Sequence, residues 1–160
     1  MIPQCAARRR IVLCAGVMLA AAMLWPNDAA VARSPEIYTG IVSATAVGGY
    51  DPVAYFTDGK PVEGRRDISL TWKGVTWRFA NEKNRDAFKA NPETYAPQYG
   101  GHCAWAVSQG YTAKGDPKHW KIVGGKLYLN YNARVQKDWE RDVPGNIANS
   151  EKNWPKVLEK

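Results

Sequence analysis

Alternating apolar and polar positions predict a β-hairpin in the middle of the chain. The segments 68–72 and 75–79 both alternate, and Lys73-Gly74 stands between them. Two alternating segments around a short glycine-containing turn are typical of a hairpin. Each strand places three large apolar side chains on one face, so we expect this hairpin to form the floor of the core.

A helix is predicted after each of two hairpins. A second pair of short apolar segments, 120–123 and 126–130, flanks two glycines and predicts the second hairpin. Asn81 follows the first hairpin and Asn132 follows the second. Asparagine is a favoured N-cap, and the apolar residues after each asparagine have the spacing of a helix face.

The remaining segments predict shorter elements. Residues 50–56 are expected to form a short strand, and a short helix carrying His102 and Cys103 is expected to end at Gly110. The Pro144-Gly145 pair is expected to break the chain before a C-terminal tail. No internal repeat stands out in the sequence. The predicted fold is α+β, a single domain with a small antiparallel sheet built from hairpins and packed against short helices.

The N-terminal residues have the features of a secretory signal peptide. Three arginines (8–10) precede an apolar run over residues 11–24, and small residues at 30 and 32 fit a signal-peptidase site. The run is shorter than the roughly 20 residues that span a bilayer. We therefore expect cleavage after Ala32 and export to the periplasm or the medium, with an uncleaved N-terminal anchor as the alternative.

The chain is basic without the pattern of a nucleic-acid binder. It has 22 Lys and Arg against 15 Asp and Glu, a formal net charge of +7. The basic residues are scattered, and no basic helix or recognition motif accompanies them. The surplus favours solubility and weak attraction to anionic surfaces.

Export changes the sulfur chemistry of the protein. Of three cysteines and three methionines, only Cys103 lies beyond residue 32. The exported chain can form neither an internal disulfide nor a methionine-rich copper site. Cys103 is thus either a thiolate that binds a metal or a small buried hydrophobic residue, and the sequence leaves both interpretations open.

Three further residues are candidate partners of Cys103 at a metal ion. Thiolate, imidazole and carboxylate ligands suit copper or zinc. His102 is adjacent to Cys103, and neighbouring side chains point in different directions in a helix or strand. His119 and Asp116 come from a later segment that the fold can bring closer. The candidate metal ligands are Cys103, His102, His119 and Asp116.

The aromatic content points to a different kind of site. The chain has seven tryptophans and eight tyrosines, of which only Trp25 precedes residue 33. Aromatic residues line pockets for small organic ligands, but they also dominate the cores of small domains. The candidate pocket residues are Tyr50, Tyr55, Tyr95, Tyr99, Trp105 and Tyr111. We predict no catalytic residues, because no phosphate loop, Ser-His-Asp set, zinc-protease helix or paired carboxylates are present.

These motifs together resemble the YHS domain. The resemblance is carried by Asp51-Pro52-Val53, by 74–79 ahead of Ala87-Phe88, and by 91–95. A longer match, from Tyr99-Gly100-Gly101-His102-Cys103-Ala104 to 144–148, is similar to exported YHS-domain proteins of Gram-negative bacteria. The resemblance implies handling of heavy metals. Metal-linked members carry cysteines after the Asp-Pro-Val motif and after the aromatic strand, where this chain has Ala54 and Ala80.

The sequence therefore predicts an exported small binding domain that is not an enzyme. The first interpretation is a heavy metal such as copper bound through Cys103 and histidine. The alternatives are an aromatic-lined pocket for a small organic ligand and a cell-envelope interaction module. Nucleic acid and a membrane span after processing are not expected. The predicted segments are a signal peptide (1–32), an extended lead-in (33–48), a YHS-like α+β domain (49–143) and a C-terminal helical tail (144–160).

Overall fold

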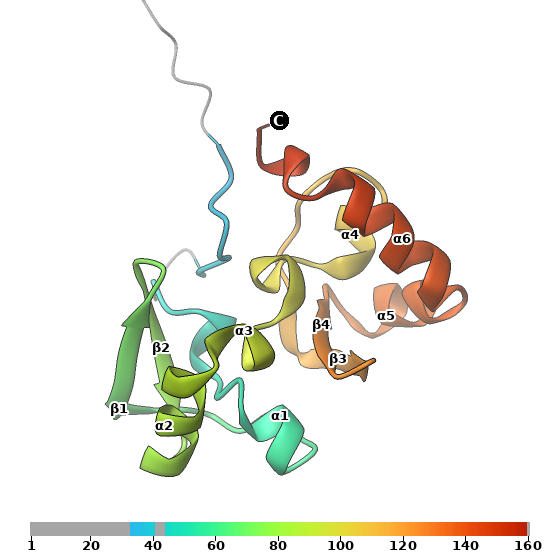
Figure 1. Cartoon of the computed structure of the whole chain (residues 1–160). Coiled ribbons are helices and arrows are strands. Elements are labelled where there is room, and N and C mark those ends of the chain that lie inside the picture. The colour runs from blue at the N-terminus through green and yellow to red at the C-terminus, as the bar shows by residue number, and fades with distance from the viewer. Residues whose placement is uncertain (1–32, 41–43, 160) are drawn as a thin grey trace, which may run out of the picture. The chain divides into compact units, whose positions relative to one another are not determined.

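The structure is a computed structural model that describes residues 33–40 and 44–159 (Figure 1). The predicted signal peptide and part of the predicted lead-in lie outside the described residues. Among the described residues, no helix combines the length and the apolar character needed to cross a membrane. These residues form a mixture of helices and two small antiparallel sheets of two strands each, which confirms the α+β prediction.

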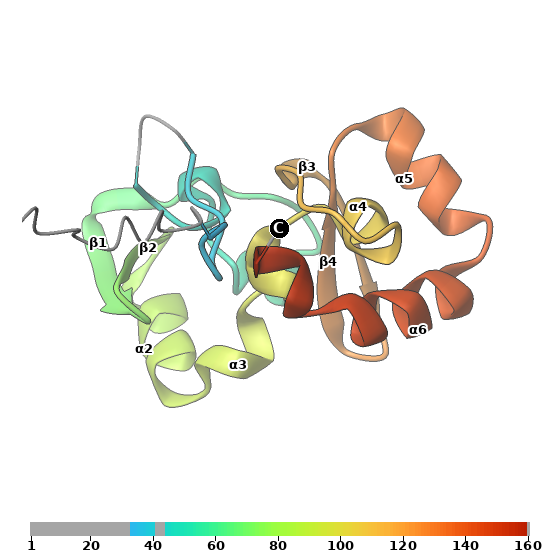
Figure 2. The same cartoon turned by 90° about the horizontal axis from the view of Figure 1, so that it is seen from above.

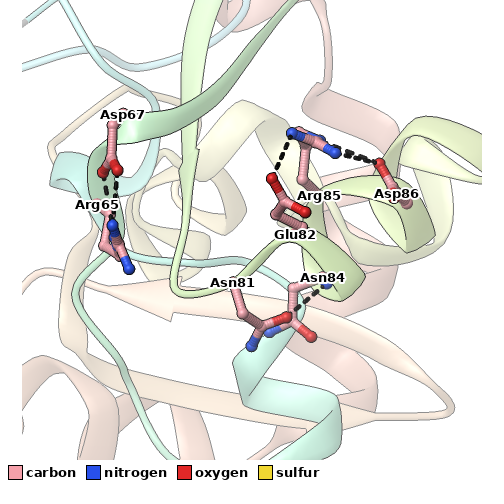
Figure 3. A network of polar contacts seen from close by, with 7 residues as sticks. All are labelled: Arg65, Asp67, Asn81, Glu82, Asn84, Arg85 and Asp86. Atoms are coloured by element: carbon pink, nitrogen blue, oxygen red, sulfur yellow. Dashed lines mark hydrogen bonds and ion pairs between the residues drawn. The ribbon is translucent and has the colours of Figure 1, made fainter.

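The first half of the fold contains the first predicted hairpin and the helix that follows it. Its elements are α1 (Ala54–Thr57), β1 (Arg65–Trp72), β2 (Val75–Phe79), α2 (Glu82–Ala90) and α3 (Pro92–Tyr95). The Asn81 side chain caps α2 by accepting a hydrogen bond from the Asn84 N–H at 2.9 Å (Figure 3). The strand predicted over residues 50–56 is wrong. The Asp51 carboxylate accepts the N–H groups of Val53 and Ala54, and the backbone turns there into α1.

The second half contains the other hairpin and three helices. Its elements are α4 (Ala104–Ser108), β3 (Asp116–Val123), β4 (Lys126–Asn130), α5 (Ala133–Glu140) and α6 (Val143–Asn153). Asn132 caps α5 through the Val135 N–H, as predicted. The predicted break at Pro144-Gly145 is wrong. Both residues lie in the first turn of α6, where proline needs no N–H partner, and the Asp142 side chain accepts the Gly145 N–H.

The two halves repeat one architecture that the sequence did not reveal. Each begins with a 3₁₀ helix, Val47–Gly49 or Gln98–Gly101, followed by a short helix, a hairpin, a helix capped by asparagine and a helix with proline in its first turn. We call residues 47–95 the N-terminal repeat and residues 98–153 the C-terminal repeat. In both views α2 lies beside the hairpin β1–β2, and α4, α5 and α6 lie around the hairpin β3–β4 (Figure 1, Figure 2).

The correspondence extends to backbone angles and irregularities. The φ angles are 52°, 59° and 87° at Val47, Gly48 and Gly49, and 54°, 60° and 84° at Tyr99, Gly100 and Gly101. The residues before α3 and α6, Asn91 and Asp142, have φ/ψ of −144°/68° and −147°/73°. Each hairpin has its register shift in the same place, after Arg65 and after Asp116. The repeats are therefore equivalent in backbone, although few side chains are shared.

Two apolar clusters form the core, and the larger one joins the repeats. The hairpin β1–β2 contributes Trp77 and Phe79 to it, which confirms its predicted place in the core, and β4 contributes Leu127 and Leu129. Tyr55 of α1 also contacts the other repeat, because its hydroxyl donates to the Pro117 carbonyl at 2.9 Å. The smaller cluster lies within the C-terminal repeat and the residues after it. Its buried members are Tyr99, Ala104, Val107, Tyr128, Trp139 and Val157.

Ion pairs of the N-terminal repeat lie on its surface. Arg85 contacts both Glu82 and Asp86, and Arg65 pairs with Asp67 at 2.6 Å (Figure 3). The Arg65 side chain lowers the pKa of Asp67 by hydrogen bonding to it. Because solvent screens exposed pairs, they contribute little to stability, and the apolar clusters hold the fold together.

Candidate functional site

A cavity of about 350 Å³ lies where the lead-in, the first hairpin and the 3₁₀ helix of the C-terminal repeat meet. Its aromatic walls come from four distant positions in the sequence, Trp72, Trp77, Tyr99 and Trp154. Trp77 and Tyr99 are buried, whereas Trp72 and Trp154 are half-buried. We call this space the tryptophan cavity.

The aromatic walls are held in place by packing and by hydrogen bonds. Trp72 and Trp77 meet at 5.5 Å between ring centroids, and the Trp77 indole N–H donates to the Trp72 carbonyl at 3.2 Å. On the other side, Tyr99 and Trp154 pack at 5.7 Å. The Tyr99 hydroxyl donates to Glu151 at 3.3 Å, and burial raises the pKa of Tyr99. The walls are therefore fixed before any ligand enters.

Charged groups also line the tryptophan cavity. Lys73 pairs with Glu36 at 2.8 Å and lies 4.9 Å from the centre of the Trp72 ring. Glu93 and Lys126 line the same space, and neither forms an ion pair with another described residue. A carboxylate and an ammonium thus stand beside flat apolar walls.

Gly100 allows the lead-in to approach the cavity. Its carbonyl accepts the Tyr38 N–H at 2.9 Å, and its φ of +60° suits glycine. A side chain at this position would overlap the backbone of Glu36. The close approach places Glu36 and Ile37 in the cavity lining.

Cys103, the first metal candidate, is buried and free of disulfide bonding. It is 1% exposed, and burial raises the pKa of its thiol, while the backbone N–H groups of Ala106, Tyr131 and Trp105 act in the opposite direction. The Sγ atom lies 3.9 Å from Asn130 Oδ1. Asn130 is fully buried, and its Nδ2 has no hydrogen-bond partner among the described residues. The thiol is therefore protonated near neutral pH.

His102 fastens the lead-in to the C-terminal repeat. Its Nε2 donates to the Pro35 carbonyl at 2.8 Å, and its ring packs between Tyr38 and Trp154. Burial lowers the pKa of His102, although the carbonyls of Pro35 and Ala113 favour the protonated ring. Its Nδ1 is buried and makes no hydrogen bond of good geometry with a described residue.

The other metal candidates are placed on β3. Asp116 accepts the Lys118 N–H at 2.8 Å, so its carboxylate shapes the start of the strand, and His119 is half-buried further along it. Within residues 33–40 and 44–159, no three His, Cys, Asp or Glu side chains are grouped to hold a metal ion. The four predicted ligands therefore do not form a common site.

Of the predicted pocket residues, Tyr99 lines the tryptophan cavity. Tyr55 bonds Pro117 and packs on Trp120, while Tyr50 contacts Glu63 and Tyr95 packs on Phe56. Trp105 and Tyr111 pack against each other elsewhere.

Trp72, Trp77 and Trp154 were missed as pocket residues. Trp72 and Trp77 lie in the two segments that predict the first hairpin and the core, and Trp154 lies in the predicted C-terminal tail.

The Asp-Pro-Val segment holds the N-terminal repeat together. Asp51 is fully buried, and its Oδ1 accepts the N–H groups of Val53 and Ala54. Its Oδ2 accepts the Ala80 N–H at 2.9 Å and Asn84 Nδ2 at 2.7 Å. One carboxylate thus joins α1, the end of β2 and α2, which explains the spacing of the motif residues.

Comparison with known proteins identifies one part of the chain. No curated protein and no solved structure matches the chain. The YHS domain family matches residues 53–99, from the start of α1 to the 3₁₀ helix that carries Tyr99. Residues 53–99 are therefore similar to the YHS domain, as the motifs indicated.

Proposed function

We propose that this protein is an exported, non-enzymatic binding domain that holds a small organic ligand in the tryptophan cavity. The observation that carries the proposal is the cavity of about 350 Å³ walled by Trp72, Trp77, Tyr99 and Trp154. Fixed aromatic walls bind flat apolar groups with little loss of side-chain freedom. Export is supported by the basic and apolar pattern of residues 8–32.

The charged groups narrow the class of ligand. Glu93 and Lys126 stand at the cavity without ion-pair partners among the described residues, so a ligand with both an acidic and a basic group satisfies both. A flat, zwitterionic molecule fits these features best.

The test is tryptophan fluorescence during titration with a panel of small aromatic zwitterions and their uncharged analogues. We expect saturable quenching by at least one zwitterion and weaker binding to Trp72→Ala and Ala96→Leu, which open and narrow the cavity. Trp105→Ala, a half-buried tryptophan outside the cavity, is the matched control and should bind normally. Equal loss in all three variants, or no saturable quenching, would reject the proposal.

Copper binding through Cys103 is a second candidate, and it follows from the metal association of YHS domains together with one feature of this chain. The backbone N–H groups of Ala106, Tyr131 and Trp105 lower the pKa of the Cys103 thiol, in opposition to the larger effect of burial. Titration with copper(I) compares the wild type with Cys103→Ser and His119→Gln. Tight binding that only Cys103→Ser removes supports this candidate, and equal binding by wild type and Cys103→Ser contradicts it.

A further inference from the structure

One exposed face of α5 carries three cations at helical spacing. Arg134, Lys137 and Arg141 are exposed and follow one another by about one turn along one side of the helix. With Trp105 and Ala133 they line an open groove of about 710 Å³. The one acidic residue in its lining, Asp138, pairs with Arg141 at 3.3 Å. We call this surface the basic groove.

Exposed aromatic rings adjoin the basic groove. Tyr111 and Tyr131 are the exposed large hydrophobic residues of the described chain, at 47% and 43%. Tyr111 packs edge-on against Trp105, which lines the groove, and Tyr131 directly precedes the cap of α5. The Lys114 Nζ lies 5.2 Å from the centre of the Tyr131 ring. Through Trp105 and Tyr111, aromatic rings thus adjoin the cations of the groove.

The fold itself does not require this surface. In the N-terminal repeat, the residue that corresponds to Trp105 is Val53, which is buried. The residues that correspond to Arg134, Lys137 and Arg141 are Lys83, Asp86 and Ala90, so only one of the three cations has a counterpart. Because the same backbone is built without Trp105 and without two of the cations, stability of the repeat does not account for the whole set.

We propose that the basic groove binds an acidic saccharide. The guanidinium and ammonium groups pair with carboxylates on the sugar, and the rings of Trp105 and Tyr111 pack against the C–H faces of pyranose units. The site is separate from the tryptophan cavity, because the two share no lining residue.

The position of α5 argues against a membrane surface as the occupant. A helix that lies on a bilayer inserts its apolar face. The apolar side of α5 faces the protein instead, where Trp139 is fully buried and packs on Tyr128 at 5.4 Å. The face that remains outside is a polar groove, which suits a soluble anionic chain.

The experiment measures binding of an oligogalacturonate to the full chain by calorimetry, with a neutral maltooligosaccharide of equal length as comparison. We expect the oligogalacturonate to bind more tightly and to weaken as salt rises. The charge-reversed variant Arg134→Glu/Lys137→Glu/Arg141→Glu should lose about tenfold or more in affinity. Trp105→Ala should weaken binding of the same probe by a smaller factor.

The matched control is Lys60→Glu/Lys83→Glu/Lys89→Glu, which changes net charge equally at exposed residues outside the groove. It should bind as the wild type does. Equal loss in both triple variants would show attraction by net charge alone and overturn the proposal. Absence of oligogalacturonate binding, or tighter binding to phosphatidylglycerol vesicles or to a single-stranded oligonucleotide, would overturn it as well.

Discussion

Asp51 and Cys103 occupy corresponding places in the two repeats, but the two side chains differ in the hydrogen bonds that they accept. The Asp51 carboxylate accepts the N–H groups of Val53, Ala54 and Ala80. The corresponding N–H groups of the C-terminal repeat belong to Trp105, Ala106 and Tyr131. They lower the pKa of the Cys103 thiol less than burial raises it, and the Cys103 side chain accepts no capping hydrogen bond. The same backbone position thus holds a hydrogen-bonded carboxylate in one repeat and a thiol without capping hydrogen bonds in the other.

The two positions show how a repeated backbone tolerates different occupants. At Asp51, Asn84 Nδ2 completes the network, so both carboxylate oxygens are satisfied. At Cys103, Asn130 Oδ1 accepts the Trp105 N–H at 3.3 Å, and its own Nδ2 is left without a partner among the described residues. Charge-assisted hydrogen bonds therefore stabilise the surroundings of Asp51, and the surroundings of Cys103 have no counterpart to them.

Removing the anion is expected to have the largest effect. Asp51→Ala leaves the buried donors of α1, β2 and α2 without an acceptor and should lower the free energy of unfolding by about 3 kcal/mol or more. Urea denaturation measures this change in the free energy of unfolding. Asp58→Ala removes an exposed carboxylate that bonds Thr57 and should change the value by less than about 0.5 kcal/mol. Similar values for both variants would mean that the position of Asp51 needs no anion.

Placing a carboxylate at the corresponding position of the C-terminal repeat tests whether the two positions are equivalent. Cys103→Asp should fold and lose less than about 2 kcal/mol if the N–H groups of Trp105, Ala106 and Tyr131 can donate to a carboxylate as their counterparts do at Asp51, with the Asn130 amide rotated to donate as well. Val107→Asp, at an equally buried position without such donors, should lose more than about 4 kcal/mol or fail to fold. Equal losses measured by urea denaturation would refute the equivalence.

Acid should weaken the attachment of the lead-in to the C-terminal repeat. Since burial lowers the pKa of His102 in the folded state, the unfolded chain binds the proton more tightly. The stabilising effect of neutral His102 is complete above the unfolded pKa of about 6.5 and declines as the pH falls below it. Urea midpoints between pH 7.5 and 5.5 should fall in wild type and in His119→Gln, but less in His102→Gln. Parallel slopes in all three proteins would contradict this.

The two helix caps should have the smallest and most similar effects. Asn81→Ala and Asn132→Ala each remove one side-chain acceptor at the start of α2 or α5 and should each lower the free energy of unfolding by about 1 kcal/mol. Thermal denaturation of the two variants gives the comparison. A loss at one cap alone would show that the repeats do not share this feature energetically.

Local patterns made the hairpins, the capped helices and the YHS motifs predictable from sequence. Alternation and asparagine caps act over a few residues, and they led correctly to β1–β2, β3–β4, α2 and α5. The segment 50–56 was misassigned because its β-prone residues were weighed above a local helix-start signal, Asp51 followed by Pro52. The Asp51 carboxylate accepts the nearby N–H groups of Val53 and Ala54, and its further bonds to Ala80 and Asn84 could not be predicted from local sequence.

The cavity and the repeat depend on the same kind of long-range arrangement. Tyr99 was predicted as a pocket residue, but Trp72 and Trp154 are distant in sequence and meet it only in the folded chain. The sequence did not predict the repeat, because the two halves share glycines and asparagine caps but few other side chains. Cys103 stands at the position of Asp51, and Trp139 stands at the position of Phe88. Backbone geometry is preserved where side-chain identity is not.

The larger apolar cluster joins the two repeats, and it therefore determines which fragments of this protein can fold on their own. Leu127 and Leu129 pack with Trp77 and Phe79, so the span 53–99 that matches the family does not enclose its own hydrophobic interior. An excised fragment with those limits would expose apolar surface and would tend to self-associate. The smallest fragment expected to fold cooperatively therefore includes both repeats, and the span that is similar to the YHS domain is shorter than this fragment.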